Sequence, residues 1–260
     1  MLGVLTVTAC SRGTRPIITP ATPAEPRGAP RNGLEVVGWM RFAHPSRQLQ
    51  TLSFTVHSRR LADSTTRDAT VYARLPGQMR MDVEHGDRMS VIRERHRASV
   101  FRNGRRVSTT TGIDLGALLA FDVFAEAVDT TIMWLDSARM RFGVARRDRF
   151  GHADAWVVGA NDGDETSTQF WVDADQWRLL RVIQPESQQA RGGTDIRYVS
   201  YTELLDTPVP TRVEIWRDGR LVQEDTYSDF VVNPALPAKA FDMNRLRTIR
   251  PPKSAAPSTR

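Results

Sequence analysis

The chain has 260 residues, of which 40 % are hydrophobic and 25 % charged, the balance of an ordinary globular protein with a sizeable core. No stretch approaches the roughly 18–20 apolar residues that a helix needs to cross a bilayer. The formal net charge is +6, but residues 11–31 carry +3 and residues 245–260 carry +5, which leaves −2 for the remainder. Because nucleic-acid-binding proteins concentrate basic residues on their folded surface, no nucleic-acid partner is expected.

The only cysteine, Cys10, ends the tetrapeptide Val7-Thr8-Ala9-Cys10, which resembles a bacterial lipobox. The resemblance implies that the thiol receives diacylglycerol and that residues 1–10 are a truncated-looking lipoprotein signal segment. Two acyl chains anchor a protein stably, at ~0.8 kcal/mol per buried CH₂ group. The alternative is a free cysteine at a frayed N-terminus, because no Lys or Arg precedes Cys10 as in a complete signal peptide.

The two ends of the chain differ in composition from its body. Residues 11–31 contain five prolines among many Thr, Ala and Gly residues, which predicts a disordered tether. Residues 246–260 predict a basic disordered tail that touches anionic lipid or is simply solvated. Residues 32–245 are expected to form one folded domain.

The body opens with apolar residues at helical spacing over 34–42, and Pro45 should end this helix. Residues 46–61 fit either a short amphipathic helix or a first strand, since Leu52, Phe54 and Val56 alternate. From Ala69 onward apolar residues recur at every second position, which is the period of a β-strand. Strands are predicted over 79–83, 90–93, 98–102, 140–144, 155–158, 168–172, 177–183, 196–201, 212–217 and 221–230. The pairs Asn103-Gly104 and Asp218-Gly219 predict tight hairpin turns, so the strands should form an antiparallel meander.

One helical segment interrupts the strands. Residues 112–128 place Leu, Phe, Ala and Val residues on a wide apolar face, and Asp114 lies in the first turn, where a carboxylate suits the helix dipole. The apolar character continues over 131–135. This predicts one amphipathic helix over Leu115–Val128 that covers the apolar face of the sheet.

The order of these pieces resembles the LolA/LolB-like family of outer-membrane lipoprotein carriers and sorters. The motifs that carry the resemblance span 72–82, 100–105, 155–159, 169–181, 198–201, 207–213 and 232–241. The resemblance covers about residues 34–242. It implies a mainly β (α+β) fold, a curved antiparallel half-barrel sheet with helices plugging its concave face, an apolar cavity for acyl chains, and no cofactor. The family's lid-latching arginine is not assigned to any arginine here.

The expected ligand-binding residues combine a lid and a facing wall. On the lid they are Leu118, Leu119, Phe121 and Phe124. On the wall some of the following residues are expected: Met79, Met81, Trp156, Phe170, Trp171 and Tyr198. Strand alternation leaves open which of the wall residues face inward. If the helix packs permanently, this apolar surface is ordinary core; if it swings aside, the surface is a pocket.

Chemistry-bearing motifs are sparse. The five histidines show no i, i+4 pair on a predicted helix, so no metal is expected, and the acidic run 161–165 reads as a solvated turn. No Gly-x-Ser-x-Gly elbow or phosphate loop occurs. The leading hypothesis is therefore a non-enzymatic, monomeric binder of lipid or lipoprotein acyl chains, anchored to the outer membrane facing the periplasm, with a periplasmic carrier as a partner. A ligand-free scaffold lipoprotein is the alternative, and a hydrolase is third.

Overall fold

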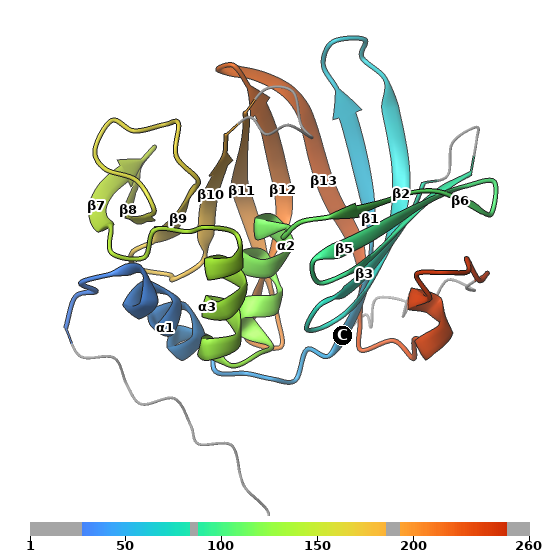
Figure 1. Cartoon of the computed structure of the whole chain (residues 1–260), viewed down its shortest axis with the longest axis horizontal. Helices are drawn as coiled ribbons and strands as arrows, with labels where there is room; N and C mark the ends of the chain where they lie inside the picture. The colour runs from blue at the N-terminus through green and yellow to red at the C-terminus, as the bar shows by residue number, and fades with distance from the viewer. Residues whose placement is uncertain (1–27, 84–87, 186–192, 249–260) are drawn as a thin grey trace, which may run out of the picture.

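A single antiparallel sheet organises the chain. The computed structural model describes residues 28–83, 88–185 and 193–248, and within these ranges the sheet has 13 strands. Figure 1 shows the strands curving around a group of helices. The mainly β half-barrel with helices on its concave face, predicted from the sequence, is confirmed.

The first half of the sheet is a run of consecutive hairpins. Its strands are β1 (Thr51–Arg60), β2 (Thr66–Arg74), β3 (Gln78–Val83), β4 (Met89–Glu94), β5 (Arg97–Arg102) and β6 (Arg105–Thr111). The predicted turn at Asn103-Gly104 joins β5 to β6, and both residues adopt the positive φ that such turns need. Of the two alternatives for residues 46–61, the strand is the correct one: β1 covers Thr51–Arg60, and its alternating residues Leu52, Phe54 and Val56 are buried.

The second half repeats this arrangement after the helical insertion. Its strands are β7 (Ala145–Phe150), β8 (Ala153–Val158), β9 (Gln169–Asp173), β10 (Leu179–Gln184), β11 (Thr194–Leu204), β12 (Thr207–Arg217) and β13 (Arg220–Val232). The turn at Asp218-Gly219 joins β12 to β13, again with positive φ at both residues.

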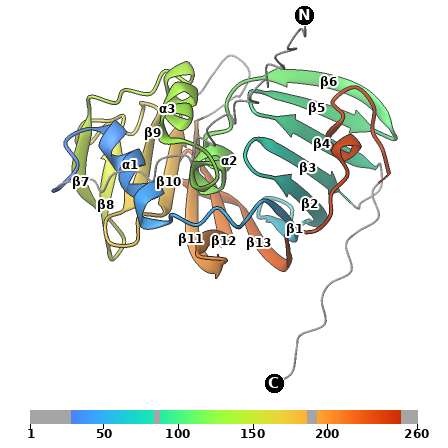
Figure 2. The same cartoon turned by 90° about the horizontal axis from the view of Figure 1, so that it is seen from below.

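The two halves meet where β1 pairs antiparallel with β13. The strand order is β6-β5-β4-β3-β2-β1-β13-β12-β11-β10-β9-β8-β7, so the sheet ends in β6 on one side and β7 on the other. Seen from below in Figure 2, the sheet forms two wings, and most of the helices lie over the wing that ends in β7. The result is an open half-barrel whose concave face carries the main core.

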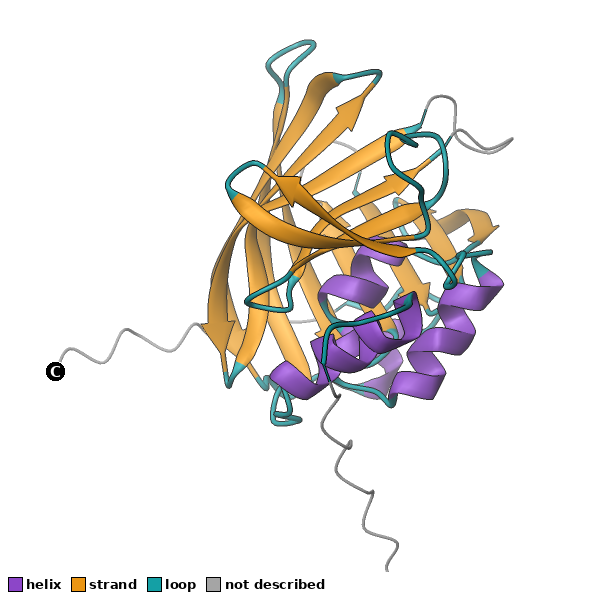
Figure 3. Ribbon diagram, turned by 90° about the vertical axis from the view of Figure 1, so that its left-hand side faces the viewer, coloured by secondary structure: helices purple, strands orange, loops and turns teal. Residues whose placement is uncertain are grey.

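Four helical elements occupy the concave face: α1 (Gly33–Ala43), α2 (Leu115–Ala120), η1 (Asp122–Phe124) and α3 (Val128–Ser137). Asn32 caps α1 by accepting a hydrogen bond from the Glu35 amide at 3.0 Å. Figure 3 shows the helices gathered toward one end of the half-barrel. The other end of the concave face is left without a helix above it.

Several details of the sequence prediction were wrong. The single helix over Leu115–Val128 is instead split, because the backbone leaves the helical region at Phe121, with φ −134° and ψ −59°. Residues 140–144 form a loop rather than a strand, since the carbonyl of Phe142 accepts from the Gly33 amide to hold α1. Strand β6 was missed because all its residues are exposed, and so it lacks the alternation that marks a half-buried strand.

The C-terminal segment packs on the convex face. Here η2 (Ala238–Phe241) and Met243 cover Ile92 and Phe101. The buried guanidinium of Arg80 donates to the carbonyls of Ala240 at 3.2 Å and Arg247 at 2.6 Å. The packed part of the chain therefore extends to Arg247.

The predicted signal segment 1–10, the tether as far as residue 27, and the tail from residue 249 lie outside the described residues. In the part of the chain that the structure describes, no helix has both the length and the apolar character of a membrane-spanning segment.

Candidate functional site

An apolar cavity of about 390 Å³ opens on the concave face. One wall comes from β1–β4 and the other from β11–β13, and α2 lies against it. Its apolar lining consists of Phe54, Val56, Ala69, Val71, Met79, Met81, Val83, Met89, Val91, Phe121, Ile196, Tyr198, Val213, Ile215 and Tyr227. A concave site with this lining suits the apolar part of a ligand.

Strand alternation explains why these side chains converge. Phe54 and Val56 lie two residues apart on β1 and so share a face. Their cross-strand partners on β2 are Val71 and Ala69, which therefore point the same way. Each strand contributes every second residue, and the half-barrel curvature brings these rows toward one another.

Three methionines make one wall adaptable. Met79 and Met81 on β3 and Met89 on β4 line the cavity and are only half-buried. Unbranched thioether side chains fill irregular space and rearrange readily. This wall can therefore follow the shape of a flexible ligand.

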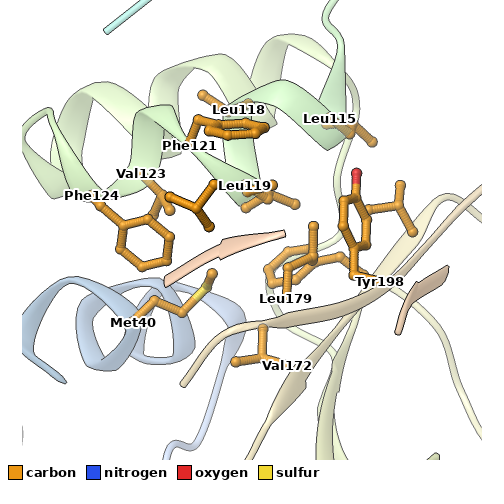
Figure 4. Packing of buried hydrophobic residues seen from close by; sticks show 14 of the residues in the cluster. Met40, Leu115, Leu118, Leu119, Phe121, Val123, Phe124, Val172, Leu179 and Tyr198 are labelled. Carbon is orange, nitrogen blue, oxygen red and sulfur yellow. The ribbon is translucent and has the colours of Figure 1, made fainter. Parts of the chain in front are cut away.

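The segment α2–η1 closes one side of the cavity. Asp114 caps α2 by accepting from the Ala117 amide at 3.0 Å. Figure 4 shows Leu115 and Leu119 of α2 facing Tyr198 and Leu179 of the sheet. Phe121, where the helix ends, stacks on Phe54 with ring centroids 6.2 Å apart.

Polar contacts fasten this segment to the β2–β4 side. Asp114 forms an ion pair with Arg93 of β4. Glu126 pairs with Arg95, in the turn after β4, at 2.9 Å. The carboxylate of Asp122 accepts a hydrogen bond from the Gly77 amide at 2.8 Å. The α2–η1 segment is thus held by apolar packing on one side and by carboxylates on the other.

Asp122 is the most perturbed of these carboxyl groups. Burial raises its pKa from 3.8 to about 7, and the nearby carboxylate of Glu126 acts in the same direction. The Gly77 amide, Arg95 and Arg93 oppose the shift. The carboxyl group of Asp122 therefore gains or loses its charge near neutral pH, while it accepts the hydrogen bond from Gly77.

The predicted lid residues are all buried, but they do not share one role. Phe121 lines the cavity, whereas Leu118 faces a smaller pocket beside Leu75 and Trp134. Leu119 and Phe124 pack in the main core.

The predicted wall residues divide similarly. Met79, Met81 and Tyr198 line the cavity. Trp156 and Phe170 belong to the main core but not to the cavity lining.

Trp171 does not belong to this wall, which is one of the alternatives that strand alternation leaves open. Neighbouring residues of a strand point to opposite faces, so Phe170 and Trp171 cannot both face inward. Trp171 lies on the convex face, where its ring centroid is 6.1 Å from that of Phe150 and its Nε1 donates to Gln169. The alternation of β9 alone does not say which of its two faces is the concave one.

Several residues that line the cavity were not predicted from the sequence. They are the inward residues of β1, β2 and β4, among them Val56, Ala69 and Val91, and the ion pair of Arg93 with Asp114. The alternation of Leu52, Phe54 and Val56 was a usable signal for β1. Nothing in the sequence links Arg93 to Asp114, because the pair depends on where α2 crosses β4.

Comparison with solved structures identifies the architecture. A structure described as an outer membrane lipoprotein-sorting protein domain, from Vibrio parahaemolyticus, aligns at 12 % identity and TM-score 0.54 over 82 % of this chain and 97 % of that one. A DUF1329 family protein from Desulfovibrio piger aligns at 13 % identity and TM-score 0.54, over 81 % of this chain and 95 % of its own. A LolA superfamily protein from Nitrosomonas europaea aligns at 14 % identity and TM-score 0.49, over 81 % and 97 %.

The chain shares the fold of the lipoprotein-sorting domain and of the DUF1329 protein, the LolA-like half-barrel expected from the sequence. No protein-family model matches the chain, and no curated protein matches it. At these sequence identities the comparison shows a shared fold only. Any function proposed for the cavity must therefore be argued from the side chains that line it in this protein. Across residues 28–83, 88–185 and 193–248, no three His, Cys, Asp or Glu side chains gather in an arrangement that could hold a metal ion.

Proposed function

We propose that the protein is a non-enzymatic carrier or acceptor that holds acyl chains of lipids or lipoproteins in this cavity. The observation that carries the proposal is the cavity itself: about 390 Å³, lined by aliphatic, methionine and aromatic side chains. Burial of apolar surface contributes roughly 25 cal/mol per Å², and an acyl chain offers only apolar surface. The LolA-like fold of a lipoprotein-sorting domain supports the same reading.

The α2–η1 segment serves as a movable lid in this proposal. An acyl chain can replace the contacts of Phe121 with Phe54 at similar energy, so ligand binding shifts the lid at little net cost. The contacts of Asp114, Asp122 and Glu126 with the β2–β4 side then hold the closed position.

The polar groups at the cavity support binding rather than catalysis. Arg93 is engaged by Asp114, and Asp225 accepts hydrogen bonds from Ser58 and Gln223. A general acid or base needs instead a group free to reach a reacting atom.

The envelope location is part of the proposal. Lipidation of Cys10, followed by the Pro-rich stretch 11–31, would anchor the domain to the outer membrane facing the periplasm and leave it free to meet a periplasmic carrier. The described lining of the cavity comes from other residues, so variants at Cys10 and variants in the cavity test the anchor and the binding site separately.

A cavity-blocking variant tests the binding function. Val91 lines the cavity on β4 and is half-buried, so Val91→Trp places an indole in the ligand's space. The matched control is Val107→Trp on the edge strand β6, where Val107 is 57 % exposed. We expect Val91→Trp to weaken binding of a fluorescent monoacylglycerol at least about tenfold, equivalent to ~1.4 kcal/mol, and the control to leave it unchanged. Equal binding by both variants would contradict the proposal.

A further inference from the structure

The inward face of the half-barrel changes from apolar to polar along its strands. At one level Phe54 of β1 lies beside Val71 of β2. At the next level Val56 lies between Ala69 of β2 and Tyr227 of β13. These two levels are the apolar trough of the cavity.

The following level is polar on the same three strands. Ser58 of β1 is the cross-strand partner of Arg67 on β2 and of Asp225 on β13. One level further out, Arg60 of β1 lies beside Gln223 of β13. All five side chains line the same cavity.

We name these five residues the polar collar: Ser58, Arg60, Arg67, Gln223 and Asp225. From Phe54 to Ser58 the strand advances four residues, or about 13 Å at ~3.3 Å per residue. The collar therefore lies at the end of an apolar trough, at the β1–β2 hairpin, away from Phe121 and α2.

The charges of the collar favour an anion. Arg67 is exposed on β2 and has neither an ion pair nor a side-chain hydrogen bond with any residue that the structure describes. Arg60 makes one long contact, 3.5 Å, with Asp63, and both side chains are about half exposed. Among the residues that the structure describes, little engages these two guanidinium groups, and the planar fork of arginine fits carboxylate and phosphate oxygens.

The one carboxylate of the collar is already engaged. Asp225 is buried and accepts hydrogen bonds from Ser58 and from the Gln223 amide, the latter at 2.8 Å. Burial raises the pKa of Asp225, and the hydrogen bonds from Ser58 and Gln223 act in the opposite direction.

Taking the acyl-binding function as its basis, we infer that the ligand is an anionic amphiphile. Its acyl chain lies along the trough lined by Phe54, Val56 and Tyr227, and its carboxylate or phosphate headgroup lies between Arg60 and Arg67. Ser58 lies at the level of Arg67 and Gln223 at the level of Arg60, so both are placed to meet the polar linkage between chain and headgroup.

Competition among amphiphiles of one chain length tests the inference on the full chain. A fluorescent monoacylglycerol is the bound neutral probe, and a fatty acid, a lysophosphatidic acid and an unlabelled monoacylglycerol displace it. We expect the anions to compete about tenfold better than the neutral monoacylglycerol, and the difference to shrink as salt screens the exposed arginines. If only one anion is favoured, the headgroup is assigned to that source, carboxylate or phosphate.

The double variant Arg60→Gln, Arg67→Gln should bring the anions to within about threefold of the neutral competitor, with each competitor compared against that variant's own affinity for the neutral probe. Arg59→Gln is the matched control, because Arg59 neighbours Arg60 but points to the other face and pairs with Glu224 at 3.0 Å. Equal competition by anionic and neutral amphiphiles in the wild type, or an anion preference that survives the double variant, would overturn the headgroup inference. Failure of the acyl-binding function itself looks different: the probe would not bind, or Val91→Trp would not weaken it.

Discussion

Gly116 of α2 lies directly against the hydroxyl group of Tyr198 on β11. A Cβ atom on Gly116 would stand 2.5 Å from the Tyr198 Oη, closer than such atoms approach in proteins. Tyr198 is buried, so its ring has little room to retreat. This contact fixes how closely α2 can approach the sheet.

Gly116→Ala should therefore push α2 away and destabilise the domain by about 1–3 kcal/mol, measured by urea denaturation. Adding Tyr198→Phe removes the clashing oxygen and should restore stability. In the double variant the helix preference of Ala over Gly, ~1 kcal/mol, should then become visible. A Gly116→Ala protein more stable than the wild type would show that α2 does not pack this closely on β11.

Phe121→Asp separates a movable lid from permanent core. Phe121 is buried against Phe54, and a carboxylate there cannot be solvated while α2–η1 is closed. We expect the domain to keep a cooperative thermal transition with the lid displaced, and probe binding to change strongly. Phe121→Leu is the apolar control. Loss of several kcal/mol, with loss of the cooperative transition, would instead identify the segment as permanent core.

The raised pKa of Asp122 gives stability a specific pH dependence. Because the folded-state pKa is about 7 and the ordinary value is 3.8, the folded state holds this proton more tightly than the unfolded chain. The contribution of this tightly held proton to the free energy of unfolding is fully present below about pH 4, and it is lost as the pH rises through about 7. Asp122→Asn keeps an acceptor for the Gly77 amide and removes the charge, so it should raise Tm by a few degrees at pH 8 and little at pH 4. An equal change in Tm at both pH values would refute the assignment.

Cys10→Ser tests the proposed anchor independently of the cavity. Without the thiol no thioether to diacylglycerol forms, so the protein should move from the membrane fraction to the soluble one on cell fractionation. Ser11→Ala is the control that leaves the thiol in place. Unchanged membrane association, with no lipid mass on the N-terminal peptide, would remove the anchor from the account.

The sequence was informative wherever one face of an element is buried. Alternation predicted β3 and β13, and helical spacing predicted α1. In each element one face is buried, so apolar residues recur with the period of that element. The same rule explains the failures. The exposed strand β6 has no buried face, and the break at Phe121 depends on tertiary contacts with Phe54 that no local pattern records.

The site was predictable in kind but only partly in detail. Met79, Met81, Phe121 and Tyr198 were expected at the cavity and line it. The arginines of the collar gave no signal, because Arg60 and Arg67 look like ordinary hairpin residues until β1, β2 and β13 are placed side by side. Register, which the sequence does not contain, brings the charges to the end of the apolar trough.

The most direct measurement is native mass spectrometry of the protein extracted from membranes. Besides the mass of the N-terminal lipid, we expect the wild-type protein to carry the mass of a bound acyl-bearing molecule, which is released as a fatty-acyl species on dissociation. It predicts that Val91→Trp lacks this mass and that Val107→Trp retains it. A wild-type protein that carries no acyl-bearing molecule, or a Val91→Trp variant that carries as much as the wild type, would contradict the claim that this cavity holds acyl chains.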